Sequence, residues 1–172
     1  ESIHSSKLKK YITSTGTYYL PKYAYQDVIR KEIIKNRIFD KDVFDLSKKY
    51  ITSNSIVIDA GANYGQLSVL FSKLFNDITI YSFEASKYIF DILDQNVKIN
   101  SNNIKAINCV LSNYTDEQYL QIPDLKKYGT YGSLDLEFSS NKKNTYENKT
   151  LIRKIDDFTF EKKISFMKID VQ

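Results

Sequence analysis

Residues 55–65 read SIVIDAGANYG, and this stretch decides the fold. It opens with a β-branched run that ends in an acid, Asp59, and then enters a turn that contains Gly61 and Gly65. Such a run followed by glycine is typical of a strand that leads into a turn. Apolar residues at helical spacing come next, namely Leu67, Leu70, Phe71 and Leu74. The sequence therefore predicts a strand, a glycine-containing turn and a helix.

The same alternation continues along the chain. We expect a second strand over residues 78–83, a second helix that begins at Ser86 and a third strand over residues 104–111. A fourth strand is expected over residues 164–171. Strands that alternate with helices are typical of an α/β fold, in which right-handed crossovers join parallel strands. We therefore predict a parallel sheet with helices on both faces.

Two further segments flank or interrupt this core. Residues 26–50 carry apolar residues at the spacing of one or two amphipathic helices, and we expect them to pack on the domain that follows. The predicted organisation is an N-terminal extension over residues 1–54 and the N-terminal portion of an α/β domain over residues 55–172. Residues 118–122 alternate like an edge strand or a hairpin arm, whereas residues 126–148 are polar and turn-rich and are expected to be irregular.

The composition excludes several classes of site. The 172-residue chain is 42% hydrophobic and 27% charged, as in a globular domain. It has one cysteine, Cys109, and one histidine, His4, which excludes a disulfide framework, a Cys/His zinc site and any triad with a central histidine. No metal site is expected. The sequence has no apolar run of about 18 residues and residues 1–10 lack the apolar core of a signal peptide, so a cytoplasmic setting without a membrane span fits best.

The net charge of +4 is concentrated in the N-terminal segment. Residues 1–50 hold 11 Lys and Arg against 6 Asp and Glu, and the remainder of the chain holds 14 against 15. A solvated basic surface explains this excess, because nucleic-acid binding requires basic residues that cluster with aromatic ones. The tyrosines near Lys22 in the sequence are only a weak signal of such a cluster. We therefore expect no nucleic-acid partner.

Three of the predicted strands end in a carboxylate: Asp59, Glu84 and Asp170. The carboxyl ends of parallel strands meet at one edge of a sheet, where open α/β folds bind their ligands, so these acids predict a ligand site. In the turn, Asn63 stands where many nucleotide-binding loops have glycine, because asparagine also adopts a positive φ. Glu84 is placed to accept hydrogen bonds from ribose hydroxyls. The alternative interpretation of Glu84 is an exposed acid at a strand end.

Several stretches in a fixed order resemble the FkbM family of S-adenosylmethionine-dependent methyltransferases. They are VIDAGANYGQLSVLFSK (57–73), YSFEAS (81–86), the spaced Asn96 and Asn100, TLIRKIDDF (150–158) and FMKIDVQ (166–172), preceded by a similar lead-in, YYLPKYAYQDVI (18–29). The ordered set is more specific than any one stretch. The resemblance implies a Rossmann-like methyltransferase sheet and S-adenosylmethionine as the cofactor.

The resemblance also implies roles for individual residues. The glycine turn would lie against the methionine part of the cofactor, and the acid after the second strand would hold the ribose. By this likeness the cofactor-binding residues are Asp59, Gly61, Ala62, Asn63, Gly65, Glu84, Ala85, Leu111 and Ser112, of which the last two would lie near the adenine. Asp170 is assigned by its position: at the end of the strand beside the glycine-turn strand it is the carboxylate best placed for the reacting end of the cofactor. There it would orient the cofactor or act as the base, with a structural acid at a strand end as the alternative.

The predicted function is methyl transfer from S-adenosylmethionine. The family alone implies O-methylation of a sugar or another hydroxylated metabolite, so the expected acceptor is a small molecule or a glycan, and the oligomeric state stays open. An NAD-type oxidoreductase is disfavoured, because residues 61–65 do not form the G-x-G-x-x-G pattern. A non-catalytic binding module that keeps the fold is the other alternative.

The C-terminus departs from the family pattern. Members continue Lys-Ile-Asp-Val with Glu-Gly, whereas Gln172 follows Val171 here. The full fold needs further strands after this point, so the resemblance implies that the chain holds the first four core strands. Natural folds normally pair or hide a sheet edge. We therefore expect residues 1–172 alone to be poorly soluble or oligomeric and to lack methyltransferase activity.

Overall fold

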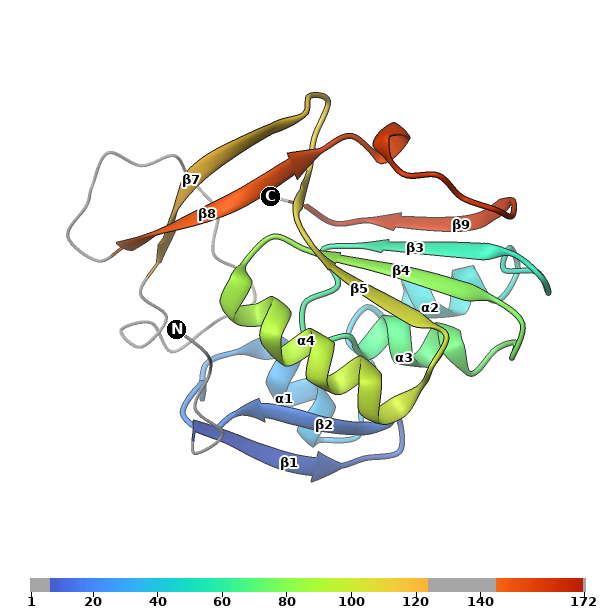
Figure 1. The fold of residues 1–172 in the computed structure, drawn as a ribbon. Helices are drawn as coiled ribbons and strands as arrows, with labels where there is room; N and C mark the ends of the chain where they lie inside the picture. The colour runs from blue at the N-terminus through green and yellow to red at the C-terminus, as the bar shows by residue number, and fades with distance from the viewer. Residues whose placement is uncertain (1–6, 124–144, 172) are drawn as a thin grey trace.

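A parallel four-stranded sheet forms the centre of the molecule (Figure 1). The structure, a computed structural model, describes residues 7–123 and 145–171. The strands of the central sheet are β3 (Ile56–Ala60), β4 (Thr79–Glu84), β5 (Ile104–Asn108) and β9 (Ile164–Ile169), in the order β5-β4-β3-β9. Because every pairing in this sheet is parallel, the predicted α/β class is confirmed.

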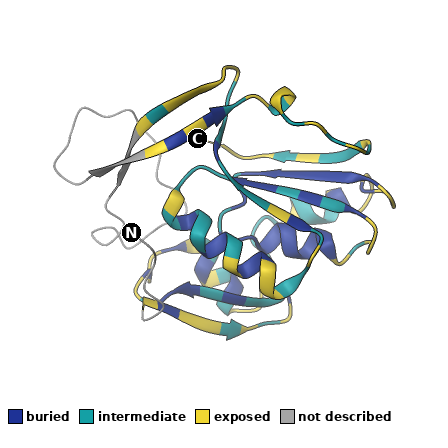
Figure 2. Cartoon of the chain, in the orientation of Figure 1, coloured by how far each residue is buried: buried dark blue, intermediate teal, exposed yellow. Residues whose placement is uncertain are grey.

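The two elements on either side of the glycine turn are the most deeply buried (Figure 2). Every residue of β3 and every residue of α3 (Gln66–Ser72) is shielded from solvent. Side chains alternate between the two faces of a strand, so Val57 joins one apolar cluster while Ile56 and Ile58 join another. Burial of each large aliphatic side chain stabilises the fold by about 1.5–3 kcal/mol. The turn is therefore held between two fixed elements.

The described α-helices lie on one face of the central sheet (Figure 1). They are α1 (Val28–Ile34), α2 (Lys41–Ser47), α3 and α4 (Lys87–Asn100). On the other face, the Phe83 ring packs edge to face on the Phe158 ring, with their centroids 5.0 Å apart. The rings of Tyr81 and Phe160 pack in the same way at the same centroid distance. Large aromatic rings bury enough surface to cover a sheet. Within the described residues, the α-helices thus lie on one face and not on both as predicted, because an aromatic segment covers the opposite one.

A β-hairpin that the sequence analysis did not predict precedes the N-terminal helices. Its strands are β1 (Leu8–Ile12) and β2 (Thr17–Pro21). Asn96 Oδ1 accepts a hydrogen bond from the Tyr19 N–H at 2.7 Å, and Asn100 Oδ1 accepts one from the Thr17 N–H at 2.9 Å. Both asparagine amides donate back to the carbonyls of the same two residues. Helix α4 thereby satisfies backbone groups along the edge of β2. The predicted helices over residues 26–50 are confirmed as α1 and α2.

The third predicted strand is divided between two sheets. Strand β5 ends at Asn108, and β6 (Val110–Leu111) joins a second sheet with β8 (Thr145–Arg153) and β7 (Asp116–Pro123), in the order β6-β8-β7. Strand β7 confirms the predicted edge strand or hairpin arm. Residues 126–144 of the predicted irregular stretch lie outside the described residues. The prediction was wrong for residues 145–148, because their backbone pairs with β7 despite their polar character.

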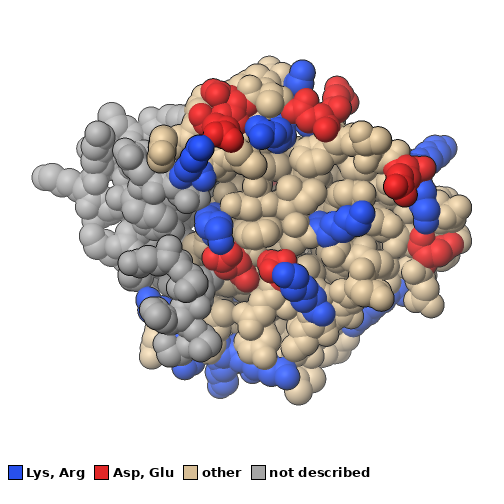
Figure 3. Space-filling view, viewed as in Figure 1, with Lys and Arg blue, Asp and Glu red and all other residues tan. Residues whose placement is uncertain are grey.

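Charges of both signs share the visible surface (Figure 3). On the face shown, Lys and Arg side chains are interspersed with Asp and Glu. The helices carry exposed pairs at i,i+4 spacing, such as Lys98 with Asp94 at 2.6 Å, and such pairs contribute about 0.3–0.5 kcal/mol each. Among the residues that the structure describes, no helix has both the length and the apolar character needed to cross a membrane.

Candidate functional site

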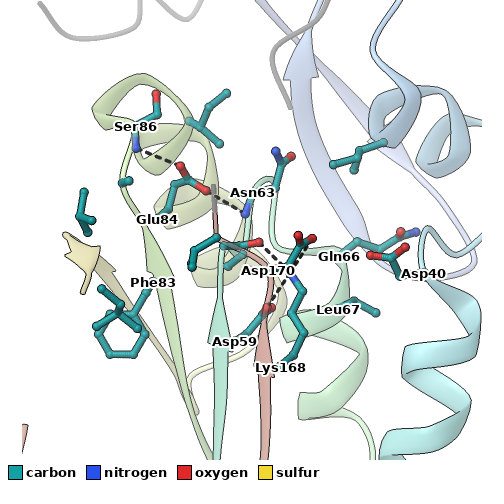
Figure 4. Close-up of a pocket in the computed structure, with 18 of the residues that line it drawn as sticks. Asp40, Asp59, Asn63, Gln66, Leu67, Phe83, Glu84, Ser86, Lys168 and Asp170 are labelled. Atoms are coloured by element: carbon teal, nitrogen blue, oxygen red, sulfur yellow. Dashed lines mark hydrogen bonds and ion pairs between the residues drawn. The ribbon is translucent and has the colours of Figure 1, made fainter. Parts of the chain in front are cut away.

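The carboxyl ends of β4, β3 and β9 border a cavity (Figure 4). All three strand-end acids, Asp59, Glu84 and Asp170, line it. The other residues that line the cavity are Ile29, Phe39, Asp40, Gly61, Ala62, Asn63, Gln66, Leu67, Phe83, Ala85, Ser86, Ile89, Cys109, Val110, Leu111, Lys168 and Val171. Parallel strand order thus brings together acids that are far apart in the sequence.

The glycine turn takes its shape from three residues with a positive φ. These angles are 77° at Gly61, 51° at Asn63 and 87° at Gly65. A side chain at Gly61 would place its Cβ only 1.9 Å from the carbonyl oxygen of Asp170, so the turn and the end of β9 approach as closely as a glycine allows. The prediction that Asn63 adopts a glycine-like conformation is confirmed.

Glu84 holds the glycine turn and the start of α4 at the same time. Its carboxylate accepts hydrogen bonds from the Asn63 N–H at 3.1 Å and from the Ser86 N–H at 2.9 Å. Burial raises the pKa of Glu84 to about 7, although the two backbone N–H donors and the positive charge of Lys168 lower it. The carboxyl group is therefore fixed in position and poised to change its charge near neutral pH.

Asp59 lies beneath the turn as a fully buried carboxylate. Its Oδ2 accepts a hydrogen bond from the Ser68 hydroxyl at 2.5 Å, and the Ser68 and Ser82 hydroxyls share another at 2.7 Å. Among the residues that the structure describes, its Oδ1 has no hydrogen-bond partner and forms an ion pair with Lys168 Nζ at 3.5 Å. A buried acceptor without a donor is costly, so this oxygen points to a donor that a ligand supplies.

Lys168 is a member of the site that the sequence analysis did not single out. Its Nζ donates to the Gly61 carbonyl at 2.8 Å and lies between Asp59 and Asp170, 3.5 and 3.6 Å from their carboxylates. Only 9% of its side chain is exposed. The sequence spacing could have indicated this role, because residues two apart in a strand lie on the same face and Lys168 precedes the strand-end acid Asp170 by two residues. It links β9 to the glycine turn.

The backbone of Asp170 is fixed by the glycine turn and β3, whereas its side chain is exposed. Its N–H donates to the Ala60 carbonyl at 3.0 Å, and its own carbonyl lies against Gly61. The side chain is 60% exposed and forms an ion pair with Lys168. The backbone is therefore structural, while the carboxylate stays accessible from the cavity.

Two residues predicted for the site do not line the cavity. The α-hydrogen face of Gly65 is turned to α4, where a Cβ would meet Leu93 Cδ1 at 2.8 Å and Val97 Cγ1 at 3.3 Å. Ser112 follows β6, and its N–H donates to the Arg153 carbonyl. By contrast, Ala62, Ala85 and Leu111 are among the lining residues.

The N-terminal segment supplies one wall of the cavity, which the sequence analysis did not foresee. Ile29, Phe39 and Asp40 line it. Gln66 anchors this wall, because its amide donates to the Arg37 carbonyl at 2.8 Å and its Oε1 accepts from the Phe39 N–H at 2.9 Å. The first residue of α3 thus fixes the segment that precedes Asp40.

Comparison with known families identifies the chain. The family model for the FkbM methyltransferase domain matches residues 59–172. The chain belongs to the FkbM methyltransferase family. This confirms the predicted resemblance, and together with the parallel sheet it identifies the fold as the Rossmann-like fold of S-adenosylmethionine-dependent methyltransferases.

Individual relatives match only part of this FkbM chain. Methyltransferase sdnD from Sordaria araneosa is 30% identical over 86 residues, which cover 49% of this chain and 32% of that protein. The chain thus matches about a third of that curated relative. Solved structures of precorrin-6y C5,15-methyltransferase from Geobacter metallireducens and of TYW2 from M. jannaschii in complex with AdoMet align with TM-scores of 0.39 and 0.40, at 19% and 16% identity. These alignments cover 44% and 59% of this chain, and 42% and 43% of those chains.

Proposed function

We propose that the cavity binds S-adenosylmethionine and that the chain forms the cofactor-binding part of a methyltransferase. The observation that carries this proposal is the pair of carboxylates in one cavity: Asp59 with a buried oxygen that lacks a donor, and Glu84 at the end of the next strand. Family membership supports the same reading. The two acids offer separate acceptors for an amino group and for ribose hydroxyls.

The donor and acceptor chemistry of the cavity fits this cofactor. Asp59 Oδ1 and the Ser86 Oγ are buried atoms without hydrogen-bond partners in the part of the chain that the structure describes, and both residues line the cavity. Cys109, Val110 and Leu111 give an apolar wall near the end of β5, as a flat aromatic base requires. Burial raises the pKa of the Cys109 thiol to about 11, so this residue serves as a small apolar group rather than a nucleophile.

When bound, the cofactor supplies a methyl group on a positively charged sulfur. The protein contributes position and proton transfer. Glu84 would hold the ribose by accepting hydrogen bonds from its hydroxyls, and Asp59 would hold the amino group by accepting one from it. Asp170 accepts the proton of the acceptor hydroxyl, since its carboxylate is exposed at the cavity and its backbone is fixed against Gly61. Lys168 holds the Asp170 side chain in place.

The acceptor class follows from the family resemblance: a sugar or another hydroxylated metabolite that is methylated on oxygen. The accessible carboxylate of Asp170 supports an oxygen acceptor, because a hydroxyl must lose its proton during transfer. The cytoplasmic location and the organisation into an extension over residues 1–54 and an α/β domain over residues 55–172 also remain predictions.

The first test is calorimetric titration of S-adenosylmethionine and S-adenosylhomocysteine, with NAD⁺ as the competing nucleotide. Both adenosyl ligands are expected to bind and NAD⁺ is not. Charge-assisted hydrogen bonds contribute about 1.5–3 kcal/mol, so Glu84→Ala should weaken both adenosyl ligands by about 10- to 150-fold. The matched control is Glu161→Ala, at an exposed acid that precedes β9 at the opposite edge of the sheet. Equal affinity of wild type and Glu84→Ala would remove Glu84 from the site.

A further inference from the structure

One wall of the cavity comes from residues that precede the matched family region. Asp40 belongs to this wall and approaches from the side opposite to Glu84, with Asp59, Lys168 and Asp170 between them (Figure 4). Its backbone has φ 54° and ψ 45°, a left-handed conformation that costs energy in any residue with a side chain. Strain of this kind persists where the surrounding structure imposes it, and it is concentrated at functional sites.

The Asp40 side chain does not serve its local helix. It precedes α2 directly, yet it makes no capping hydrogen bond to that helix. The residues just before it are fixed to the glycine-turn helix through Gln66, which bonds to both Arg37 and Phe39. The backbone carbonyl of Asp40 accepts from the Phe44 N–H in the first turn of α2. The position of Asp40 is therefore set on one side by α2 and on the other by the residues that Gln66 holds.

Asp40 shares the cavity with the other charged groups, Asp59, Lys168 and Asp170. Burial raises the pKa of Asp40, and the charges of Lys168, Asp170 and Asp59 act on it as well. Among the described residues that line the cavity, four carboxylates stand against one ammonium group, that of Lys168. The buried Asp59 Oδ1 in the same cavity has no hydrogen-bond partner. An excess of negative charge, with an acceptor whose neighbour within the described residues is the Lys168 ammonium at 3.5 Å, suits a ligand that carries positive charge.

We propose that Asp40 makes the site selective for the positively charged cofactor over its neutral-sulfur product. This inference rests on the proposed function. S-adenosylmethionine and S-adenosylhomocysteine share the adenosine, the amino group and the carboxylate, and differ in the methyl group and the charge on sulfur. Loss of that charge on methyl transfer removes the attraction to Asp40, which favours product release.

The test compares the two ligands in calorimetric titrations of wild type and Asp40→Asn. Asparagine tolerates the left-handed conformation and keeps the size of the side chain while it removes the charge. Opposite charges near a protein surface attract at short range, so S-adenosylmethionine should bind about 3- to 10-fold more weakly to the variant. The affinity for S-adenosylhomocysteine should change by less than about twofold.

Two further variants keep the result interpretable. Asp42→Asn makes the same change at an exposed position in the first turn of α2 and should leave the ratio of the two affinities as in wild type. Asp40→Gly relieves the backbone strain and should repeat the effect of Asp40→Asn, with a melting curve as the check on folding. An unchanged ratio in both Asp40 variants, or equal losses for both ligands, would overturn the role of Asp40. Failure of wild type to bind either ligand would instead overturn the proposed function itself.

Discussion

At the scale of single residues, Glu84 combines a structural task with the proposed recognition of ribose. Its two backbone N–H bonds fix the carboxylate, while burial raises its pKa to about 7. Ribose hydroxyls donate to the ionised form, so the affinity for S-adenosylhomocysteine should rise with pH between about 6 and 8 and then level off. Titrations across this range check the prediction, and Glu84→Gln should flatten the profile. A wild-type profile without this rise would contradict it.

The same pKa has a defined consequence for stability. The ordinary pKa of the group is 4.5 and the folded value is about 7, so the folded state holds the proton more tightly. Its contribution to stability is fully present below the ordinary pKa and is lost as pH rises to about 7. As pH rises toward 7, ionisation of this carboxyl group therefore strengthens ligand binding and lowers folding stability.

The two glycines of the turn should differ in their tolerance of a side chain. At Gly61 a Cβ would meet the backbone oxygen of Asp170, whereas at Gly65 it would meet the ends of two side chains that are able to shift. Strain at positive φ costs about 1–2 kcal/mol, and overpacking adds about 1–3 kcal/mol. Denaturant unfolding should show a loss above about 3 kcal/mol for Gly61→Ala and a smaller loss for Gly65→Ala. Equal losses of unfolding free energy in the two variants would contradict the prediction and would mean that the backbone at the end of β9 shifts to make room for the Cβ.

The sequence was informative about residues whose role depends on local pattern. Asp59, Glu84 and Asp170 could be placed at one edge because each ends a strand, and Asn63 could be assigned a positive φ because of its side chain. Asp40 could not be placed, because its position depends on how Gln66 docks a distant segment.

At the scale of elements, α4 anchors the hairpin through its asparagines. Asn96 is fully buried and bonds to both backbone groups of Tyr19 and to the Tyr64 carbonyl. Asn96→Ala would leave these groups without that partner, at a cost of about 2–4 kcal/mol. Chemical denaturation should show this loss, whereas Gln95→Ala on the exposed face should change stability by less than about 0.5 kcal/mol. A loss at position 96 as small as the control would refute the anchoring role.

The helices and strands could be predicted where burial imposes an apolar pattern on the sequence. They could not be predicted where a strand forms because of the strand it pairs with. The alternating strands and helices of residues 55–108 follow from their apolar periodicity. Strands β1 and β2 are short and lack a clear alternation, and only Gly16 between two β-prone runs indicated a hairpin. Strand β8 owes its conformation to β7, a partner that periodicity within one strand does not reveal.

At the scale of the whole molecule, one apolar core joins the N-terminal segment to the central sheet. Leu8, Tyr18 and Ile33 belong to the same buried cluster as Val57 and Leu93. The cavity likewise draws its walls from both parts, since Asp40 faces it from one side and Glu84 from the other. The segment before residue 55 is therefore bound to the sheet by packing as well as by hydrogen bonds.

This shared core predicts that the hairpin and the sheet unfold together. The Tyr19 N–H in β2 bonds to Asn96, and the Ile80 N–H in β4 bonds to the Asn103 carbonyl. Both amides should exchange with deuterium through global unfolding, with similar protection measured by NMR. At a concentration of S-adenosylhomocysteine about 100 times its Kd, both should exchange about 100-fold more slowly, because the ligand binds only the folded state. If the Tyr19 amide exchanged fast and at the same rate with and without the ligand, the hairpin would unfold independently of the sheet. It would then be attached to the sheet without being part of its cooperative fold.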